Sequence, residues 1–304
     1  PTVTIGISAY NEEANIGDLL DSIVTQDIKL FKLEEIVVAN DGSYDRTADV
    51  IKKFTSRYKL IRLIDDGEKV GRTARMNNLY RFVDSDIFVS FDADVVLSNK
   101  NVLEELVSTH KKNNALVGGY DKPALPVNWI EKMCSVWIQV WDYIRTNLDN
   151  PNCVHNHLGR ISSSNKELYK KIQYPYNLID DDQYLYFKAK ELGYKFRFNP
   201  KAVVNYRVPS NLRDYFRQFA RAISSKHRVA SKLGNKIYED YKVNLSEKIA
   251  GLWFVFKKEP VYLPVAVFFQ VLLQIYIKFF FNEDFSDGFW IRSESTKAPV
   301  LKKL

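Results

Sequence analysis

The chain has 304 residues and a formal net charge of +7, and 46% of its residues are hydrophobic and 27% charged. This is an ordinary globular composition with room for one large domain or two small ones. Its two cysteines, Cys134 and Cys153, form no CxxC pair and no metal-ligand spacing. A disulfide scaffold and a cysteine metal site are therefore not expected, and the expected environment is reducing.

The first half of the chain alternates strand and helix patterns, with no repeat or low-complexity linker. A strand at residues 2–8 leaves no signal-peptide pattern at the start of the sequence. Further strands are expected at 34–40, 59–64, 86–91 and 115–119, and helices at 16–23, 48–54 and 72–83. Such alternation predicts an α/β fold with a mostly parallel sheet and helices on both faces.

Three polar clusters follow predicted strands: "AYNEE" at 9–13, "NDGSYD" at 40–45 and "DAD" at 92–94. Open sheets of this kind bind ligands outside the carboxyl ends of their strands. In an extended segment residues i and i+2 point to the same side, so Asp92 and Asp94 are expected to enter the cleft together. One interpretation is a Mg²⁺ or Mn²⁺ site shared with substrate phosphates, and the alternative is a pair of solvated turn acids.

Two common nucleotide-binding patterns are absent from the sequence. No GxGxxG follows the first strand, and no GxxxxGK[ST] occurs. This argues against a nicotinamide-dependent dehydrogenase and against a P-loop enzyme.

Six ordered motifs over about residues 1–233 resemble glycosyltransferase family 2, an inverting family with the GT-A (Rossmann-like) fold. They are "ISAYNEEANIGDLLDSI", "VVANDGSYDRT", "GRTARMNNL", "FDAD", "LIDDDQYL" and "RQFARA". The second resembles DDGSxDxT with Asn40 for the first Asp, and the third resembles GKxxAxN with Arg72 for Lys. The last resembles the QxxRW motif of membrane-associated synthases, with Ala222 for Trp. The fifth resembles the acidic motif before the acceptor site, usually Glu-Asp, with Asp181 for Glu. The departures at Asp181 and Ala222 weaken any assignment to cellulose, chitin or hyaluronan synthases.

The resemblance implies a donor site and a metal site. The nucleotide-binding candidates are Ala9, Tyr10, Glu12, Asp41, Arg72, Asp92, Gln218 and Arg221, and the candidates for binding Mn²⁺ or Mg²⁺ are Asp92 and Asp94. Asp41 is expected to accept from the nucleobase, Tyr10 to pack on it or to be an ordinary packed aromatic, and Glu12 to reach the ribose or base. A metal at Asp94 and the fork of Arg221 would stabilise the charge of the leaving diphosphate.

Asp182 is the predicted general base, with Asp181 as an orienting partner. A positioned carboxylate can remove the proton of an attacking hydroxyl, and three adjacent acids favour a raised pKa for one of them. The alternative is that Asp182 is an acid favoured at a helix N-terminus. Gly159 and Arg160 resemble the loop under the acceptor, whereas the HxH of His155 and His157 lacks a third ligand and is interpreted as acceptor-loop or structural.

Positive charge is concentrated at residues 201–236, which contain nine Lys or Arg and one Asp, a net charge of +8. An anionic partner is expected there: a phosphate, a membrane surface or nucleic acid. Within it Arg217, Arg221, Arg228 and Lys232 form the basic side of a predicted helix, and a plain surface helix is the alternative.

Residues 260–281 form an apolar run that as a helix would reach about 30 Å, enough to cross a bilayer. Gln270, Gln274 and Lys278 interrupt it four residues apart, a polar stripe typical of a helix in the membrane interface or packed on the catalytic domain. Trp253 and Trp290 fit an interfacial belt. A soluble core helix pair and a full span are the alternatives.

The expected organisation is a GT-A catalytic domain at 1–236, with a nucleotide-sugar half at about 1–120 and an acceptor half at about 121–236. A membrane-associating helical region follows at 237–304. The expected function is metal-dependent transfer from a nucleotide-diphosphate sugar, with UDP favoured, to a lipid-linked or glycan acceptor at the cytoplasmic face of the cell membrane. The alternatives are a GDP-mannose-type transferase and a non-catalytic membrane or nucleic-acid binding module using 201–236. A nucleotidyltransferase is disfavoured, and no nucleic-acid partner is expected.

Overall fold

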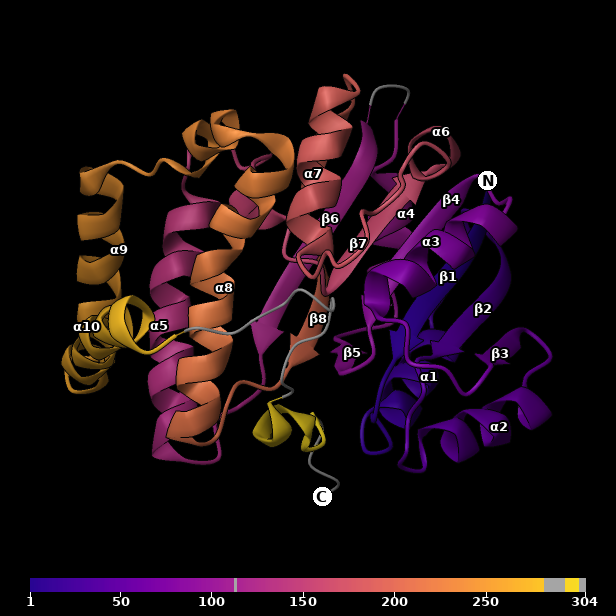
Figure 1. The fold of residues 1–304 in the computed structure, drawn as a ribbon, viewed down its shortest axis with the longest axis horizontal. Helices are drawn as coiled ribbons and strands as arrows, with labels where there is room; N and C mark the ends of the chain where they lie inside the picture. The colour runs from indigo at the N-terminus through magenta and orange to yellow at the C-terminus, as the bar shows by residue number, and fades with distance from the viewer. Residues whose placement is uncertain (112–113, 282–292, 301–304) are drawn as a thin grey trace.

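The computed structural model describes residues 1–111, 114–281 and 293–300 (Figure 1). Its centre is an eight-stranded sheet with the order β3-β2-β1-β4-β7-β6-β8-β5. The strands are β1 (Thr2–Ala9), β2 (Lys32–Asn40), β3 (Ile61–Asp65), β4 (Ile87–Asp92), β5 (Val95–Leu97), β6 (Asn114–Pro123), β7 (Ile161–Asn165) and β8 (Lys195–Tyr206).

Ten α-helices surround the sheet or extend from it within the described residues. They are α1 (Ile16–Val24), α2 (Thr47–Arg57), α3 (Arg72–Phe82), α4 (Val102–Ser108), α5 (Trp129–Thr146), α6 (Lys166–Tyr169), α7 (Asp181–Glu191), α8 (Leu212–Leu233), α9 (Leu245–Phe256) and α10 (Tyr262–Phe279). Short 3₁₀ helices cover Val154–Asn156, Asn235–Tyr241 and Glu294–Lys297.

The N-terminal half confirms the predicted alternation of strand and helix. Strands β3, β2, β1 and β4 are parallel neighbours, and each is followed along the chain by a helix or by the acidic turn. The central strands β1 and β4 are buried along most of their length, as expected for parallel strands covered on both faces. The carboxyl ends of β1, β2 and β4, which carry the three polar clusters, therefore meet at one edge of the sheet.

The other half of the sheet is less regular than the sequence indicated. Four of the seven strand pairings are parallel, but β7 runs antiparallel to both β4 and β6, and β5 runs antiparallel to β8. Strands β5, β7 and β8 were not expected from the sequence. β5 has only three residues and β7 reads "ISSSN", so neither has the apolar alternation that identifies a strand.

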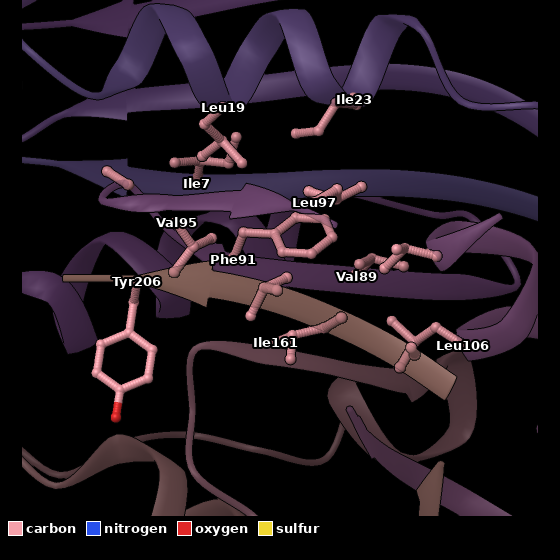
Figure 2. Packing of buried hydrophobic residues seen from close by; sticks show 14 of the residues in the cluster. Ile7, Leu19, Ile23, Val89, Phe91, Val95, Leu97, Leu106, Ile161 and Tyr206 are labelled. Atoms are coloured by element: carbon pink, nitrogen blue, oxygen red, sulfur yellow. The ribbon is translucent and has the colours of Figure 1, made fainter. Parts of the chain in front are cut away.

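The core between α1 and the sheet is formed mainly by branched aliphatic residues, with the rings of Phe91 and Tyr206 among them (Figure 2). Ile7, Leu19, Val89 and Phe91 are fully buried there. Tyr206, at the end of β8, points its hydroxyl away from this cluster in the same view. The packed layer fixes the strand ends that carry the polar clusters.

Helix α8 is held at both ends by local chemistry. Asn211 caps its N-terminus by accepting from the backbone N–H of Asp214 at 2.9 Å, and Gly234 ends it with φ +87°. These two residues determine where the long basic helix begins and ends. The predicted basic surface is partly an interior one, because Arg207 pairs with Glu131 and Arg228 with Asp180.

Helices α9 and α10 lie outside α5 and α8, at the edge of the molecule farthest from β3 (Figure 1). The predicted polar stripe divides: Gln270 is buried and donates to the Tyr215 hydroxyl at 2.9 Å, whereas Gln274 and Lys278 are exposed. α10 is apolar and long enough to span a membrane, with 22% of its residues buried. Trp253 on α9 is exposed, and Trp290 lies outside the described residues.

Candidate active site

A cavity of about 380 Å³ opens at the carboxyl ends of β1, β2 and β4. The start of α7 and the inner face of α8 form its other walls. Among its lining residues are most of the candidates from the sequence: Tyr10, Glu12, Asp41, Arg72, Asp92, Asp94, Asp181, Asp182, Gln218 and Arg221. The candidates therefore gather from segments more than 200 residues apart.

Ala9 is the one candidate that lies outside the cavity wall. Its side chain is fully buried in the core, and its carbonyl accepts the backbone N–H of Asp41 at 2.8 Å. Ala9 thus joins the ends of β1 and β2 and can act on a donor only through its neighbours.

The acidic "DAD" segment is a turn, so the expectation of an extended segment is wrong. Strand β4 ends at Asp92, and β5 begins at Val95. The chain turns here because β5 does not continue β4. It joins the far edge of the sheet, where it pairs antiparallel with β8. Both carboxylates still line the cavity, although each contacts a different cation.

Arg72 links the two halves of the site. Its guanidinium contacts Asp92 at 2.8 Å and Asp181 at 2.8 Å. One residue thus ties the end of β4 to the start of α7. The contact of Arg72 with the donor stays a prediction.

The three adjacent acids at the start of α7 have different partners. Arg228 holds Asp180 through two hydrogen bonds of 2.7 and 2.8 Å, and Arg72 holds Asp181. Asp182 has no cationic partner among the described residues and accepts only the backbone N–H of Gln183, at 2.8 Å. Burial, followed by the charges of Asp181 and Asp180, raises the pKa of Asp182 to about 7.

Gly159 lies directly against Asp182. It has φ +73°, and a Cβ built on it would lie 2.8 Å from the Cβ of Asp182. The next residue, Arg160, also lines the cavity, where its guanidinium contacts Asp121 at 2.7 Å. Neither histidine of the HxH lines the cavity: His155 stacks on Trp141, and His157 is buried against Tyr186 and Phe196.

The carboxylate of Asp41 already has several donors. It accepts from the backbone N–H groups of Val70 (2.9 Å) and Gly71 (3.1 Å) and from Nε of Arg75 (3.0 Å). Arg75 also makes two hydrogen bonds to Asp66, at 2.6 and 2.7 Å. Asp41 therefore fixes the loop at 66–71, and a nucleobase N–H at the predicted contact would have to share the carboxylate with these donors.

The aromatic end of the cavity has a cation as well as a ring. The ammonium of Lys69 lies 4.3 Å from the centre of the Tyr10 ring, and Tyr44 meets the same ring edge-on at 6.1 Å. Tyr10 is partly exposed, so it is not an ordinary core aromatic. A flat, electron-rich face beside a cation is chemically suited to a nucleobase.

The C-terminal segment 293–300 enters the same cavity. Its Lys297 contacts Glu12 and, at 2.9 Å, Asp94. The segment is fixed by Asp214, which accepts from Ser295 at 2.8 Å, and by Arg207, which donates to the Pro299 carbonyl at 3.0 Å. Figure 1 draws its 3₁₀ helix in yellow below the end of β8.

Sequence reasoning missed Lys297, and no signal in the sequence could have indicated it. Lys297 lies 285 residues from Glu12, in a short segment without periodicity. Glu12 was expected to contact ribose or base, but in this structure its partner is the lysine. Burial raises the pKa of Glu12 to about 7, with Lys297 lowering it and Asp94 raising it.

Helix α8 presents Gln218 and Arg221 to the cavity, one turn apart. Oε1 of Gln218 is buried and has no hydrogen-bond partner in the structure. Burial lowers the pKa of Arg221; Asp180 opposes this effect, and Arg228 and Arg160 add to it. The amide oxygen of Gln218 can accept from a ligand N–H or O–H, and the crowded guanidinium groups give this wall a positive charge.

The donor set at the DAD turn is compatible with a hard divalent cation. Asp92 and Asp94 line one wall, and the ammonium of Lys297 shows that a positive charge can occupy the position beside Asp94. Among the described residues no group of three or more His, Cys, Asp or Glu could hold a metal. A metal here would take its remaining ligands from water and phosphate oxygens, as Mg²⁺ commonly does.

The mixed α/β sheet with an acidic turn beside a cavity has the GT-A fold, and the comparisons assign the chain to a family. The family model for "Glycosyl transferase family 2" matches residues 4–172. The chain belongs to this family and is a glycosyltransferase, which confirms the resemblance found in the sequence.

Curated relatives match most of this chain but only part of their own length. A probable glycosyltransferase, YdaM of Bacillus subtilis, is 24% identical over 276 residues, which are 84% of this chain and 62% of that protein. The poly-beta-1,6-N-acetyl-D-glucosamine synthase of Staphylococcus epidermidis is 21% identical over 227 residues, 73% of this chain and 54% of the relative.

Two solved structures share the fold. The mannosyltransferase PcManGT of Pyrobaculum calidifontis, in complex with GDP-Man and Mn²⁺, has a TM-score of 0.59 and 20% identity and covers 90% of this chain and 75% of its own. TarS of S. aureus, in complex with UDP-GlcNAc, has a TM-score of 0.53 and 16% identity and covers 91% and 87%. At these identities the likeness shows the fold alone.

Proposed function

We propose that this glycosyltransferase inverts the anomeric carbon of a nucleotide-diphosphate sugar by direct attack of an acceptor hydroxyl. The observation that carries the proposal is the position of Asp182. It is the one acid of its cluster without a cationic partner among the described residues, and it lines the same cavity as Asp92 and Asp94. A base and a phosphate-binding wall in one cavity are what a single displacement requires.

The donor is proposed to lie along the DAD turn, with Mn²⁺ or Mg²⁺ held by Asp92 and Asp94. Such a cation, when bound, offsets the negative charge of the leaving diphosphate. Arg221 and Gln218 face the same space from α8. Tyr10 and Lys69 form the wall where the base is proposed to stack, and Glu12 becomes available to the donor only after Lys297 has left it.

The acceptor is proposed to enter from the side of α7 and the loop at 158–160. Asp182 removes the hydroxyl proton as the acceptor oxygen attacks, while Arg72 keeps Asp181 neutralised beside it. A carboxylate with a pKa near 7 is a stronger base than an ordinary Asp and is still ionised in a large fraction at neutral pH.

UDP is the favoured nucleotide, and a GDP-mannose-type donor is the second candidate. Support comes from structural neighbours bound to UDP-GlcNAc and to GDP-Man with Mn²⁺. The proposed acceptor is lipid-linked or a glycan, because a relative of this chain is a poly-beta-1,6-N-acetyl-D-glucosamine synthase. Residues 1–236 are proposed as the catalytic domain.

Within the region 237–304, helices α9 and α10 are proposed to hold the enzyme at the cytoplasmic face of the cell membrane, whereas residues 293–300 enter the cavity. The outward surface of the two helices is apolar: Ile249 and Trp253 on α9 and Phe268, Val271 and Ile275 on α10 are all exposed. Lys257 and Lys258 follow α9, where they can meet lipid headgroups. α10 is proposed to lie in the interface, because Gln270 and its neighbours face the protein.

A screen of nucleotide-sugars tests the proposed function. Thermal unfolding is followed with UDP- and GDP-sugars, each with and without Mn²⁺. A donor at a hundred times its Kd should add about 2.7 kcal/mol to the free energy of unfolding. We expect one base series to stabilise the protein only with the metal. Stabilisation by none of them, at millimolar concentrations and in detergent or lipid, would contradict the proposal.

A further inference from the structure

Arg160 lines the cavity, but the proposed transfer assigns it no role. Its carbonyl accepts the backbone N–H of Asp92 at 3.2 Å, and the preceding Gly159 packs on Asp182. The main chain at Arg160 is therefore held between the acidic turn and the predicted base. Its side chain lines the cavity and is 23% exposed.

A buried network holds the Arg160 side chain in one orientation. Asp121 accepts from Nη1 of Arg160 at 2.7 Å and from Nη2 of Arg145 at 3.0 Å. Arg145 in turn binds Asp142 at 2.6 Å, and Asp142 accepts from the Tyr120 hydroxyl at 2.8 Å. Burying these charges has a large desolvation cost. The network is therefore not explained by a contribution to stability alone.

The remaining surface of the guanidinium faces one aromatic ring and the cavity. Its carbon lies 3.8 Å from the centre of the Tyr206 ring, so the ring covers one face of the group. Among the described residues, Asp121 is the only acceptor that its N–H groups reach. Donors that are fixed in place, charged and still open to a cavity form a preorganised site for an oxyanion.

The surrounding charge favours an anion at this point. Arg221 approaches from α8, and the guanidinium groups of Arg228 and Arg160 are close enough to oppose its own charge. The charge of Arg160 also interacts electrostatically with Asp92 and Asp94, where the cation and diphosphate are proposed to bind. The anion that best fits both neighbours is the phosphate that carries the sugar.

We propose that Arg160 binds the sugar-bearing phosphate of the donor and stabilises the charge that this phosphate gains during transfer, with Asp121 and Arg145 as positioning residues. In this step the bond between the anomeric carbon and the phosphate oxygen breaks, and its electron pair stays on that oxygen. The acceptor oxygen bonds to the carbon, and its proton passes to Asp182. The inference rests on the proposed function.

Calorimetric titrations with nucleoside di- and monophosphates test it, in the presence of Mn²⁺. Both the uridine and the guanosine pairs are used, and the base that binds wild type more tightly is kept. Arg160→Met should weaken binding of the diphosphate by about 10- to 100-fold, the contribution of one charged hydrogen bond, and leave the monophosphate nearly unchanged. Arg160→Lys, which keeps the charge, should recover part of the loss.

Two further variants separate this effect from damage to the fold. Arg62→Met, which removes an exposed arginine paired with Glu35, should bind like wild type. Arg160→Met leaves Asp121 paired with Arg145; if it nevertheless fails to fold, Arg160→Met/Asp121→Asn removes both charges together and is titrated instead.

Three results would overturn the inference. Equal losses for the diphosphate and the monophosphate would place Arg160 away from the outer phosphate. Unchanged diphosphate affinity in Arg160→Met would remove its role altogether. Absence of diphosphate binding in wild type would overturn the proposed donor itself, and this outcome is recognised before any variant is measured.

Discussion

A substitution at Asp182 should affect catalysis and leave donor binding nearly unchanged. Asp182→Asn keeps the size of the side chain and the hydrogen bond from Gln183 but removes the basic carboxylate. We expect kcat to fall by about 10²–10⁴-fold, the usual contribution of a general base, with donor affinity nearly unchanged. Single-turnover kinetics and donor titration measure the two quantities. If transfer stays near normal, the base must be sought at Asp181 and then at Asp180.

The raised pKa of Asp182 predicts a pH dependence of both rate and stability. The base works when ionised, so kcat/KM should rise with pH through about 7. Between about pH 4 and 7 the folded state binds this proton and the unfolded state does not, so Asp182 lowers stability as pH rises through this window. Asp182→Asn should therefore gain Tm relative to wild type at pH 8, with the gain shrinking toward pH 4. Parallel Tm curves for the two proteins would contradict the raised pKa.

Gly159 offers an independent test of how Asp182 is positioned. In Gly159→Ala the new Cβ would lie 2.8 Å from the Cβ of Asp182, so the base must move. We expect a loss of kcat of at least tenfold with donor affinity retained, since a small misplacement of a catalytic group is costly. Gly193→Ala is the matched control, because it has a similar φ of +83° with no atom within 4 Å of the new Cβ. It should lose about 1–2 kcal/mol of stability, the cost of a Cβ in the left-handed region, and keep its kcat. Equal kcat for both variants would contradict the placement.

At the scale of elements, strands β1 to β4 and β6 could be predicted, whereas β5, β7 and β8 could not. β1, β2 and β4 have apolar runs followed by polar ends, and these patterns reflect burial on both faces. The position of β7 depends on its pairing with β4 and β6, which a short serine-rich segment does not encode locally. The turn at 92–94 follows from the same long-range pairing, since β5 joins β8.

The segment 293–300 predicts a competition at Asp94. A divalent cation bound to Asp94 must displace the ammonium of Lys297, because both need the same carboxylate. Lys297→Met should therefore increase the affinity for Mn²⁺ by about tenfold or more, the scale of one charged hydrogen bond. Electron paramagnetic resonance of free Mn²⁺ measures this without any turnover.

The exposed Lys53 on α2 gives the control, and Lys53→Met should bind Mn²⁺ like wild type. A weaker affinity in Lys297→Met than in wild type would show instead that the lysine assists binding. In that case the segment would be part of the donor site rather than a competitor.

At the scale of the whole molecule, the apolar surface of α9 and α10 predicts membrane binding. Replacing Trp253 and Phe268 with Ser removes two side chains that are each 58% exposed and keeps the buried residues of both helices, such as Val255 and Leu273. We expect wild type to float with anionic liposomes and the double variant to shift to the soluble fraction. Phe82→Ser, at an exposed aromatic 73% accessible on the end of α3, is the control. Equal flotation of all three proteins would contradict a membrane role for this surface.

The candidate site was predictable to the extent that its residues follow strands or repeat on a helix. Local patterns place Tyr10 and Asp92 at strand ends and Arg221 on a helix face, and the family resemblance named them as site candidates. Asp182 was named as the base from the sequence, but the ion pairs of Asp181 with Arg72 and of Asp180 with Arg228 could not be foreseen, since they depend on where α3 and α8 pack. For the same reason Asp41 could be placed in the cavity, but its contact with Arg75 could not be foreseen.

The most direct test is whether a nucleoside diphosphate binds this cavity through a metal at the DAD turn. Calorimetry with UDP and GDP, with and without Mn²⁺, compares wild type with Asp94→Asn. Because the amide side chain of this variant lacks the negative charge that the cation needs, metal-dependent binding should disappear while the unfolding temperature without ligand changes little. Equal affinity of wild type and Asp94→Asn for the nucleotide–metal pair would contradict the proposed site.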